Sequence, residues 1–166
     1  MRPRVEFVAT CPLWRGALAA RTLARQAIAA SLGECGVALR PGAELCVHLA
    51  DDARARALNA RWRGVDAPTN VLSFPAVEPA QVSDARLLGD IVLAFETVAR
   101  EAAEENKPLA DHYRHLVIHG FLHLLGFDHQ NDAEARRMEA LETRILARVG
   151  VADPHWEADE LEVAEP

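Results

Sequence analysis

Three histidines within one eleven-residue segment have the spacing of metal ligands. The segment reads His119-Gly-Phe-Leu-His123-Leu-Leu-Gly126-Phe-Asp-His129. On an α-helix, His119 and His123 project from one face, roughly 5 to 6 Å apart, which suits two imidazoles that bind one ion. Gly126 can adopt the positive φ that ends a helix, so that the chain reverses and returns His129 to the same ion. With only seven histidines among 166 residues, this spacing is not expected by chance. We predict a three-histidine metal site with an open fourth position.

The donor set and the residue after His119 limit the chemistry of this site. Three imidazoles with an open position favour Zn²⁺, one ion per chain, although Ni²⁺, Co²⁺, Fe²⁺ and Mn²⁺ also accept imidazole. Such a Zn²⁺ ion lowers the pKa of a bound water towards about 7 and polarises a phosphoryl oxygen. Metzincin proteases share the spacing HxxxHxxGxxH, but they carry a glutamate directly after the first histidine as general base. Gly120 stands there instead, so a peptidase mechanism lacks its base. Gly120 either leaves room beside the metal or permits close packing of a helix.

Hydrophobic periodicity predicts the elements that must position these residues. The expected order is strand, helix, strand, helix, two strands and three helices. Asp51 or Asp52 is the expected N-cap of the second helix, and Asp132 that of the last. We therefore predict an α+β fold: a single domain in which a small mixed four-stranded sheet packs with about five helices, with the metal site on a central helix. The expected strands are 5–9, 44–50, 71–74 and 87–95, and the expected helices are about 18–33, 52–62, 96–106, 109–125 and 132–149.

Charge is distributed unevenly along the chain. Residues 1–63 hold ten arginines and five acidic residues, a net of +5, whereas the remainder holds eight basic and twenty acidic residues, a net of -12. Residues 153–166 include six acids and no lysine or arginine, so we expect a flexible acidic tail after one domain of residues 1–152. The net charge of -7 therefore arises from the part of the chain after residue 63, including the tail. It predicts weak non-specific affinity for any nucleic acid, with selectivity that comes from the site.

Export, membrane insertion and disulfide bonding are not expected. No stretch approaches the roughly 20 apolar residues that span a bilayer, and the first residues lack the apolar core of a signal peptide. Cys11, Cys35 and Cys46 lie far apart in the sequence, as is typical of reduced thiols in a cytosol rather than of a disulfide framework or a metal knuckle. We expect a cytoplasmic protein.

Five stretches between residues 58 and 129 together resemble one known family. They are Leu58-Asn59, Trp62-Arg63-Gly64, Pro68-Thr-Asn-Val-Leu-Ser-Phe-Pro75, Leu88-Gly-Asp-Ile91, and the block from His119 to His129. In these stretches the sequence resembles the YbeY endoribonucleases, which are bacterial factors for the maturation of ribosomal RNA. The order of the expected elements on either side agrees with this family as well.

The resemblance implies a single-strand-specific, metal-dependent endoribonuclease of the bacterial cytoplasm that acts in 16S rRNA 3′-end maturation and ribosome quality control. It implies single-stranded RNA, the 16S rRNA precursor and the small ribosomal subunit with its proteins as partners, and neither DNA nor a membrane. It also implies that His119, His123 and His129 hold Zn²⁺ and that Arg63 is the functional arginine beside it.

We expect His119 and Arg63 to be the catalytic residues. The planar donor fork of Arg63 would stabilise the negative charge that develops on the phosphoryl group. Arg61 and Asn70 are candidate substrate-binding residues. Whether a metal-activated water or the 2′-hydroxyl of the RNA attacks is left open.

Several neighbouring residues have two possible roles. His112 and His115 precede His119 on nearly the same helical face, where they would support the ligands or relay protons, although partly exposed helix histidines are more common. Asp128 could orient a ligand imidazole. Trp62 could stack on bases, although core packing is the more frequent role of an aromatic residue.

Two other functions remain open. One is a non-catalytic ribosome-assembly factor with a structural zinc ion, and the other is a metallohydrolase of another class.

Overall fold

The computed structural model of the chain describes residues 2–151, so the expected acidic tail lies outside the described residues. Within that range the strands and α-helices follow the predicted order, with two short 3₁₀ helices in addition. The strands are β1 (Arg4–Ala9), β2 (Glu44–Ala50), β3 (Val71–Pro75) and β4 (Leu87–Ala94). The α-helices are α1 (Ala20–Cys35), α2 (Asp52–Arg63), α3 (Phe95–Glu104), α4 (Leu109–Leu124) and α5 (Asp132–Arg148), and the 3₁₀ helices are η1 (Pro12–Trp14) and η2 (Pro79–Asp84).

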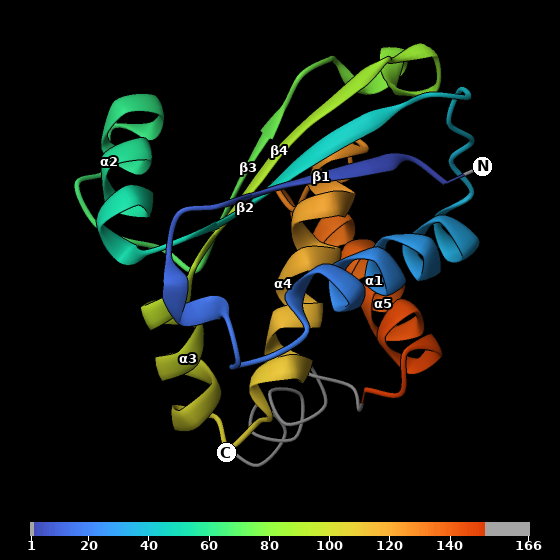
Figure 1. The fold of residues 1–166 in the computed structure, drawn as a ribbon. Helices are drawn as coiled ribbons and strands as arrows, with labels where there is room; N and C mark the ends of the chain where they lie inside the picture. Colours follow the sequence, from blue (N-terminus) through green and yellow to red (C-terminus); the bar gives the residue numbers. More distant parts are fainter. Residues whose placement is uncertain (1, 152–166) are drawn as a thin grey trace.

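The four strands form one mixed sheet in the order β1-β2-β4-β3. β1, β2 and β4 run parallel, and β3 at the edge is antiparallel to β4. Figure 1 shows α1, α4 and α5 gathered on one face of the sheet, with α2 set apart on the opposite side. In β2 the side chains of Leu45, Val47 and Leu49 join the main core, so the alternate residues, Cys46 and His48, face outward. The predicted α+β fold with a mixed four-stranded sheet is confirmed.

The fourth helix, α4, is the central element of the core. It packs against β3, β4, α1, α3 and α5, and its buried residues include Val117, Ile118, Phe121 and Leu122. A helix that is apolar on nearly every side is stable only where neighbours surround it, and the fold supplies them. The histidines on α4 therefore project from a rigid, buried scaffold. No helix of the described residues is both long and apolar enough to cross a membrane.

The ends of two helices test the expected caps. The side chain of Asp51 accepts a hydrogen bond from the amide of Arg54 at 2.8 Å, so one of the two candidate caps of α2 is confirmed. At the start of α5, however, Asn131 is the cap, and it accepts from the amide of Glu134 at 2.9 Å. The prediction of Asp132 is wrong because Asn131 holds the extended backbone that a cap requires, whereas Asp132 is already helical.

Candidate metal centre

The turn after α4 returns the third histidine to the first two. Gly126, two residues beyond the end of the helix, has a φ of 99°. Its amide donates to the carbonyl of His123 at 3.1 Å, and the amide of Phe127 donates to the carbonyl of Leu122 at 3.0 Å. These are the paired bonds of a Schellman turn. A Cβ at residue 126 would lie 2.6 Å from Cβ of Pro79. Gly126 is therefore needed both for the backbone conformation and for the close approach of η2.

The three imidazoles predicted to share an ion converge in the structure. The Nε2 atoms of His119 and His123 are 3.1 Å apart. The ring centroid of His129 lies 5.6 Å from that of His119 and 5.0 Å from that of His123. One ring nitrogen from each residue lies within 4.8 Å of the other two. In a tetrahedral zinc site, Zn–N bonds of about 2.0 Å place ligand nitrogens roughly 3.3 Å apart, so small side-chain adjustments would complete the site.

The protonation state of His123 also fits a metal ligand. Burial, together with the neighbouring His119 and His129, lowers the pKa of His123 to about 4. The ring is therefore neutral near pH 7, and a neutral imidazole offers the lone pair that a metal ion requires. The donor set fits a divalent ion that accepts imidazole nitrogen, such as Zn²⁺.

A buried carboxylate from α5 supports two of the α4 histidines. Oε1 of Glu142 lies 2.6 Å from Nδ1 of His119, and Oε2 lies 3.0 Å from Nε2 of His115. The side chain of Glu142 is 3% exposed. A carboxylate accepts at Nδ1, which places the ring proton of His119 there and leaves the Nε2 lone pair for an ion. His115 thus contacts the same carboxylate that orients the ligand His119.

No sequence motif identifies Glu142, but its position on α5 indicates that it is buried. Met138, Leu141 and Ile145 form the apolar face predicted for α5, and Glu142 lies in the same buried stripe. A carboxylate in an apolar stripe needs a buried polar partner. That requirement predicts a partner for Glu142, but it does not indicate which residue the partner is.

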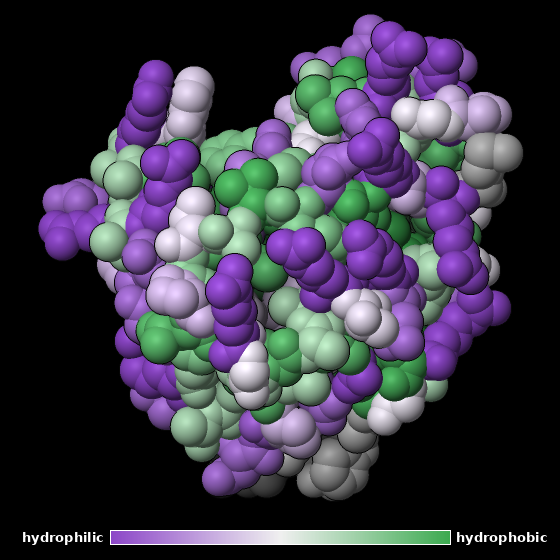
Figure 2. Space-filling view, in the orientation of Figure 1, coloured by the Kyte–Doolittle hydropathy of each residue, from purple (hydrophilic) through white to green (hydrophobic). Residues whose placement is uncertain are grey.

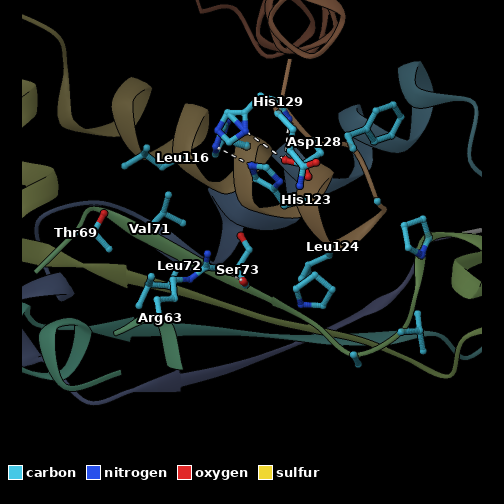
Figure 3. Close-up of a pocket in the computed structure, with 18 of the residues that line it drawn as sticks. Arg63, Thr69, Val71, Leu72, Ser73, Leu116, His123, Leu124, Asp128 and His129 are labelled. Atoms are coloured by element: carbon cyan, nitrogen blue, oxygen red, sulfur yellow. Dashed lines mark hydrogen bonds and ion pairs between the residues drawn. The ribbon is translucent and has the colours of Figure 1, made fainter. Parts of the chain in front are cut away.

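The histidines line an open cleft of about 1090 Å³ between β3 and the end of α4. In Figure 3, His123, Asp128 and His129 gather at the end of α4, and Ser73 and Arg63 lie across the cleft from them. Oδ1 of Asp128 accepts from the amide of His129 at 2.8 Å and lies 3.4 Å from Nδ1 of the same residue. Asp128 therefore stabilises the loop that carries the third histidine.

Arg63, the last residue of α2, lines the same cleft as the three histidines. Its Nη2 donates to the carbonyl oxygen of Ser73 at 2.8 Å, and its guanidinium carbon lies 5.7 Å from the centroid of the Phe74 ring. The hydroxyl of Ser73 donates in turn to the carbonyl of Gly120 at 3.2 Å. These contacts link the end of α2 to α4 through β3. The catalytic role of Arg63 stays a prediction.

Gly120 permits close packing and does not leave room beside the metal. A Cβ at residue 120 would lie 2.9 Å from Cγ2 of Ile91, 3.1 Å from Oγ of Ser73 and 3.4 Å from Cγ2 of Val71. The missing side chain therefore lets α4 approach β3 and β4. Of the two roles considered for Gly120, the structure supports packing.

Asn70 lies on the rim of the cleft, where it also fixes the start of β3. Its Oδ1 accepts from the amide of Val71 at 2.7 Å, and its Nδ2 donates to Oε1 of Glu101 at 2.9 Å. Nε2 of His112 meets the same carboxylate oxygen at 3.0 Å, and His112 is 5% exposed. The expectation that His112 is partly exposed is wrong because Glu101, from α3, covers it. A substrate-binding role for Asn70 is untested.

Arg61 and Trp62 lie on the outside of α2. The guanidinium carbon of Arg61 is 5.0 Å from the centroid of the Trp62 ring. Trp62 is 61% exposed, so the usual expectation of core packing does not hold for it. Among the described residues that line the cleft, α2 contributes Asn59 and Arg63 but not Arg61. Hydrophilic side chains project from the α2 region at the upper left of Figure 2, among weakly hydrophobic ones. The role proposed for Arg61 stays a prediction.

The fold and the cleft define a small α+β domain with a candidate three-histidine metal centre, and comparison with known proteins identifies its family. The family model "Endoribonuclease YbeY" matches residues 17–150. Two proteins named endoribonuclease YbeY are each 48% identical to this chain. One, from a Bradyrhizobium strain, aligns over 96% of both chains, and the other, from Rhodopseudomonas palustris, aligns over 95% of this chain and 92% of its own. The chain belongs to the YbeY endoribonuclease family.

One solved structure has the same fold. The solution structure of a Thermotoga maritima protein superposes with a TM-score of 0.55 and covers 98% of this chain and 97% of its own, at 23% identity.

Proposed function

We propose that this protein is a zinc-dependent endoribonuclease that cleaves single-stranded RNA. The observation that carries the proposal is that three convergent imidazoles and an arginine line one open cleft. The family supports RNA as the substrate, since the relatives that align over nearly the whole chain are named endoribonucleases.

Each residue at the cleft has a role that its contacts support. His119, His123 and His129 would hold the ion, and Glu142 orients His119 through Nδ1. When bound, Zn²⁺ supplies Lewis acidity towards a phosphoryl oxygen and lowers the pKa of water. The guanidinium of Arg63 has five N–H donors, so its one bond to Ser73 leaves others for phosphate oxygens.

The substrate is a single strand of the 16S rRNA precursor near its 3′ end, in the context of the small ribosomal subunit and in the bacterial cytoplasm. An open cleft admits a flexible strand. Asn70 on the rim and Arg61 beside the exposed ring of Trp62 would bind nucleotides that flank the cleaved bond.

Two other functions receive less support. A purely structural zinc site is normally closed by four protein ligands, but the cluster at this cleft contains three residues within the described part of the chain. A peptidase of the metzincin type would need a glutamate at residue 120, where Gly120 packs against β4 instead.

A comparison of three variants tests the proposal. We expect His123→Ala to lose both bound zinc and cleavage of a labelled single-stranded RNA. Arg63→Ala should keep its zinc but cleave about 10²- to 10³-fold more slowly, since it loses a donor to the developing charge. Arg136→Ala, which removes an exposed arginine of α5, is the control and should behave as wild type.

Zinc content, the cleavage rate and the circular dichroism spectrum are measured for each variant. The site assignment is wrong if cleavage survives in both His123→Ala and Arg63→Ala. A wild-type protein that holds zinc and cleaves no RNA would favour the assembly-factor role instead.

A further inference from the structure

A second group of potential metal ligands lies on the outer face of the sheet, opposite α4. Cys46 and His48 alternate with core residues along β2, so both face outward. Asp90 of β4 is the register partner of Cys46. The register between β2 and β4 shifts where β4 passes from Leu87 to Gly89, so that Leu88 has no register partner on β2. After this bulge Asp90 faces outward while Ile91 joins the main core.

The ligand atoms of these three residues lie close together. One oxygen of Asp90, the sulfur of Cys46 and a ring nitrogen of His48 are all within 4.8 Å of one another. Nε2 of His48 is 2.9 Å from Oδ1 of Asp90. All three side chains are half-buried on neighbouring strands, so the backbone holds them in place without a long loop. Tetrahedral coordination with bonds of about 2.0 to 2.3 Å would need ligand atoms roughly 3.3 to 3.8 Å apart.

The electrostatic surroundings of Cys46 favour a cation. Carboxylates lie on both strands that neighbour Cys46, and Asp90 of β4 is one of them. Glu6 of β1 is the register partner of Cys46 on the other side, and its carboxylate pairs with Arg4 at 2.6 Å. Two carboxylates therefore flank the thiol on the neighbouring strands, so the site presents negative charge that a divalent cation would compensate.

The site is accessible from solvent. Among the described helices, α2 lies on this face (Figure 1), and its Leu58 packs over a small cluster of Ala50, Leu72 and Val92 at one end of the sheet. The side chains of His48 and Asp90 remain 28% and 43% exposed. The surface dips between α2 and the far end of the sheet in Figure 2. The exposed parts of His48 and Asp90 leave these ligands open to an ion from solvent.

We propose that Cys46, His48 and Asp90 form a second metal site for a thiophilic divalent cation of the Zn²⁺ type. The cation bonds to Sγ of Cys46, Nε2 of His48 and a carboxylate oxygen of Asp90, and Glu6 or water completes the coordination. On binding, the thiol proton passes to solvent and the contact between His48 and Asp90 opens. This site lies across the sheet from the three-histidine cluster and does not depend on the proposed ribonuclease activity.

Cobalt substitution tests the site, because a thiolate-to-Co²⁺ charge-transfer band arises only where a cysteine is a ligand. We expect the wild-type full chain to bind two Co²⁺ ions and to show this band. Cys46→Ser should bind one ion and lose the band. His123→Ala should also bind one ion, but it should keep the band. Cys35→Ser, which alters a half-buried thiol on α1, is the matched control and should bind two ions and keep the band.

Thermal unfolding without metal shows whether each variant is folded. A second measurement uses the wild-type protein alone, so it tests the site even if a variant fails to fold. Zn²⁺ should protect Cys46 of the wild-type protein from alkylation, as read by mass spectrometry of the labelled peptide. One bound ion with no thiolate band in the wild type, or a band that persists in Cys46→Ser, would overturn the proposal. In either case the three-histidine site and its activity remain independently measurable.

Discussion

Replacement of Glu142 by glutamine should weaken metal binding at the three-histidine cluster. The amide is nearly isosteric with the carboxylate, so the buried space stays filled. It has one acceptor oxygen, whereas the carboxylate accepts from both His119 at 2.6 Å and His115 at 3.0 Å. One imidazole must therefore lose its acceptor or change tautomer, and the negative charge that polarises His119 is lost.

The expected magnitude follows from the buried position of Glu142. Loss of the partner that orients a metal-ligating histidine typically costs 10- to 100-fold in metal affinity, which is about 1.4 to 2.7 kcal/mol. At a zinc concentration 100 times the wild-type Kd, zinc adds about 2.7 kcal/mol to stability. In Glu142→Gln this contribution should fall to about 1.4 kcal/mol or less. The zinc-dependent rise in Tm should then be smaller by about 3 to 9 °C.

Two measurements on the purified protein check this reasoning. Zinc affinity is obtained by competition with a chelating dye, and Tm is recorded with and without zinc, so that any effect on the metal-free fold cancels. Glu139→Gln is the matched control, since Glu139 is an exposed residue of the same helix and its replacement removes the same charge. A zinc affinity of Glu142→Gln within twofold of wild type would refute the positioning role. An equal loss in Glu139→Gln would assign the effect to net charge.

Three further substitutions have defined outcomes. Gly126→Ala places a side chain at a φ of 99° and against Pro79, so it should destabilise the fold by about 1 to 3 kcal/mol in urea unfolding and lower zinc affinity by displacing His129. Gly120→Ala gains about 1 kcal/mol of helix propensity but overpacks the contact with β4 by about 1 to 3 kcal/mol, so a net gain in stability would contradict the packing role. Trp62→Ala should weaken single-stranded RNA binding by about 1 to 3 kcal/mol without a change in Tm, and Trp62→Phe should restore most of that affinity in a filter-binding assay.

Features that depend on local sequence were predictable. The spacing of His119, His123 and His129 requires only a helix and a turn, and the chain signals both, with an apolar α4 and Gly126 after it. The order of strands and helices follows from periodicity in the same way. Asn131 in place of Asp132 as the cap of α5 shows the limit of this reasoning, because two neighbouring residues with capping side chains compete and backbone geometry decides between them.

Features that depend on tertiary contacts were not predictable. Glu142 lies 23 residues from His119 in sequence, and only the docking of α5 on α4 brings the two together. His112 is buried because α3 supplies Glu101 as a partner, which no pattern within α4 shows. The position of Arg63 in the cleft was expected from a resemblance to a family, since the residues around an arginine at a helix end do not indicate what it faces.

β3 sets the spacing between the arginine and the metal ligands. Its inward face carries Ser73 against Gly120, next to His119, while the carbonyl of Ser73 holds Arg63. The bond to Arg63 comes from the main chain, so a substitution at Ser73 would loosen the contact with α4 and leave this bond in place. The geometry of the cleft is therefore encoded in the register of β3 on β4 and in the absence of a side chain at Gly120. Neither the strand register nor the absence of a side chain is a reactive group. Reactive side chains in the sequence therefore indicate the histidines but not the contacts that position them.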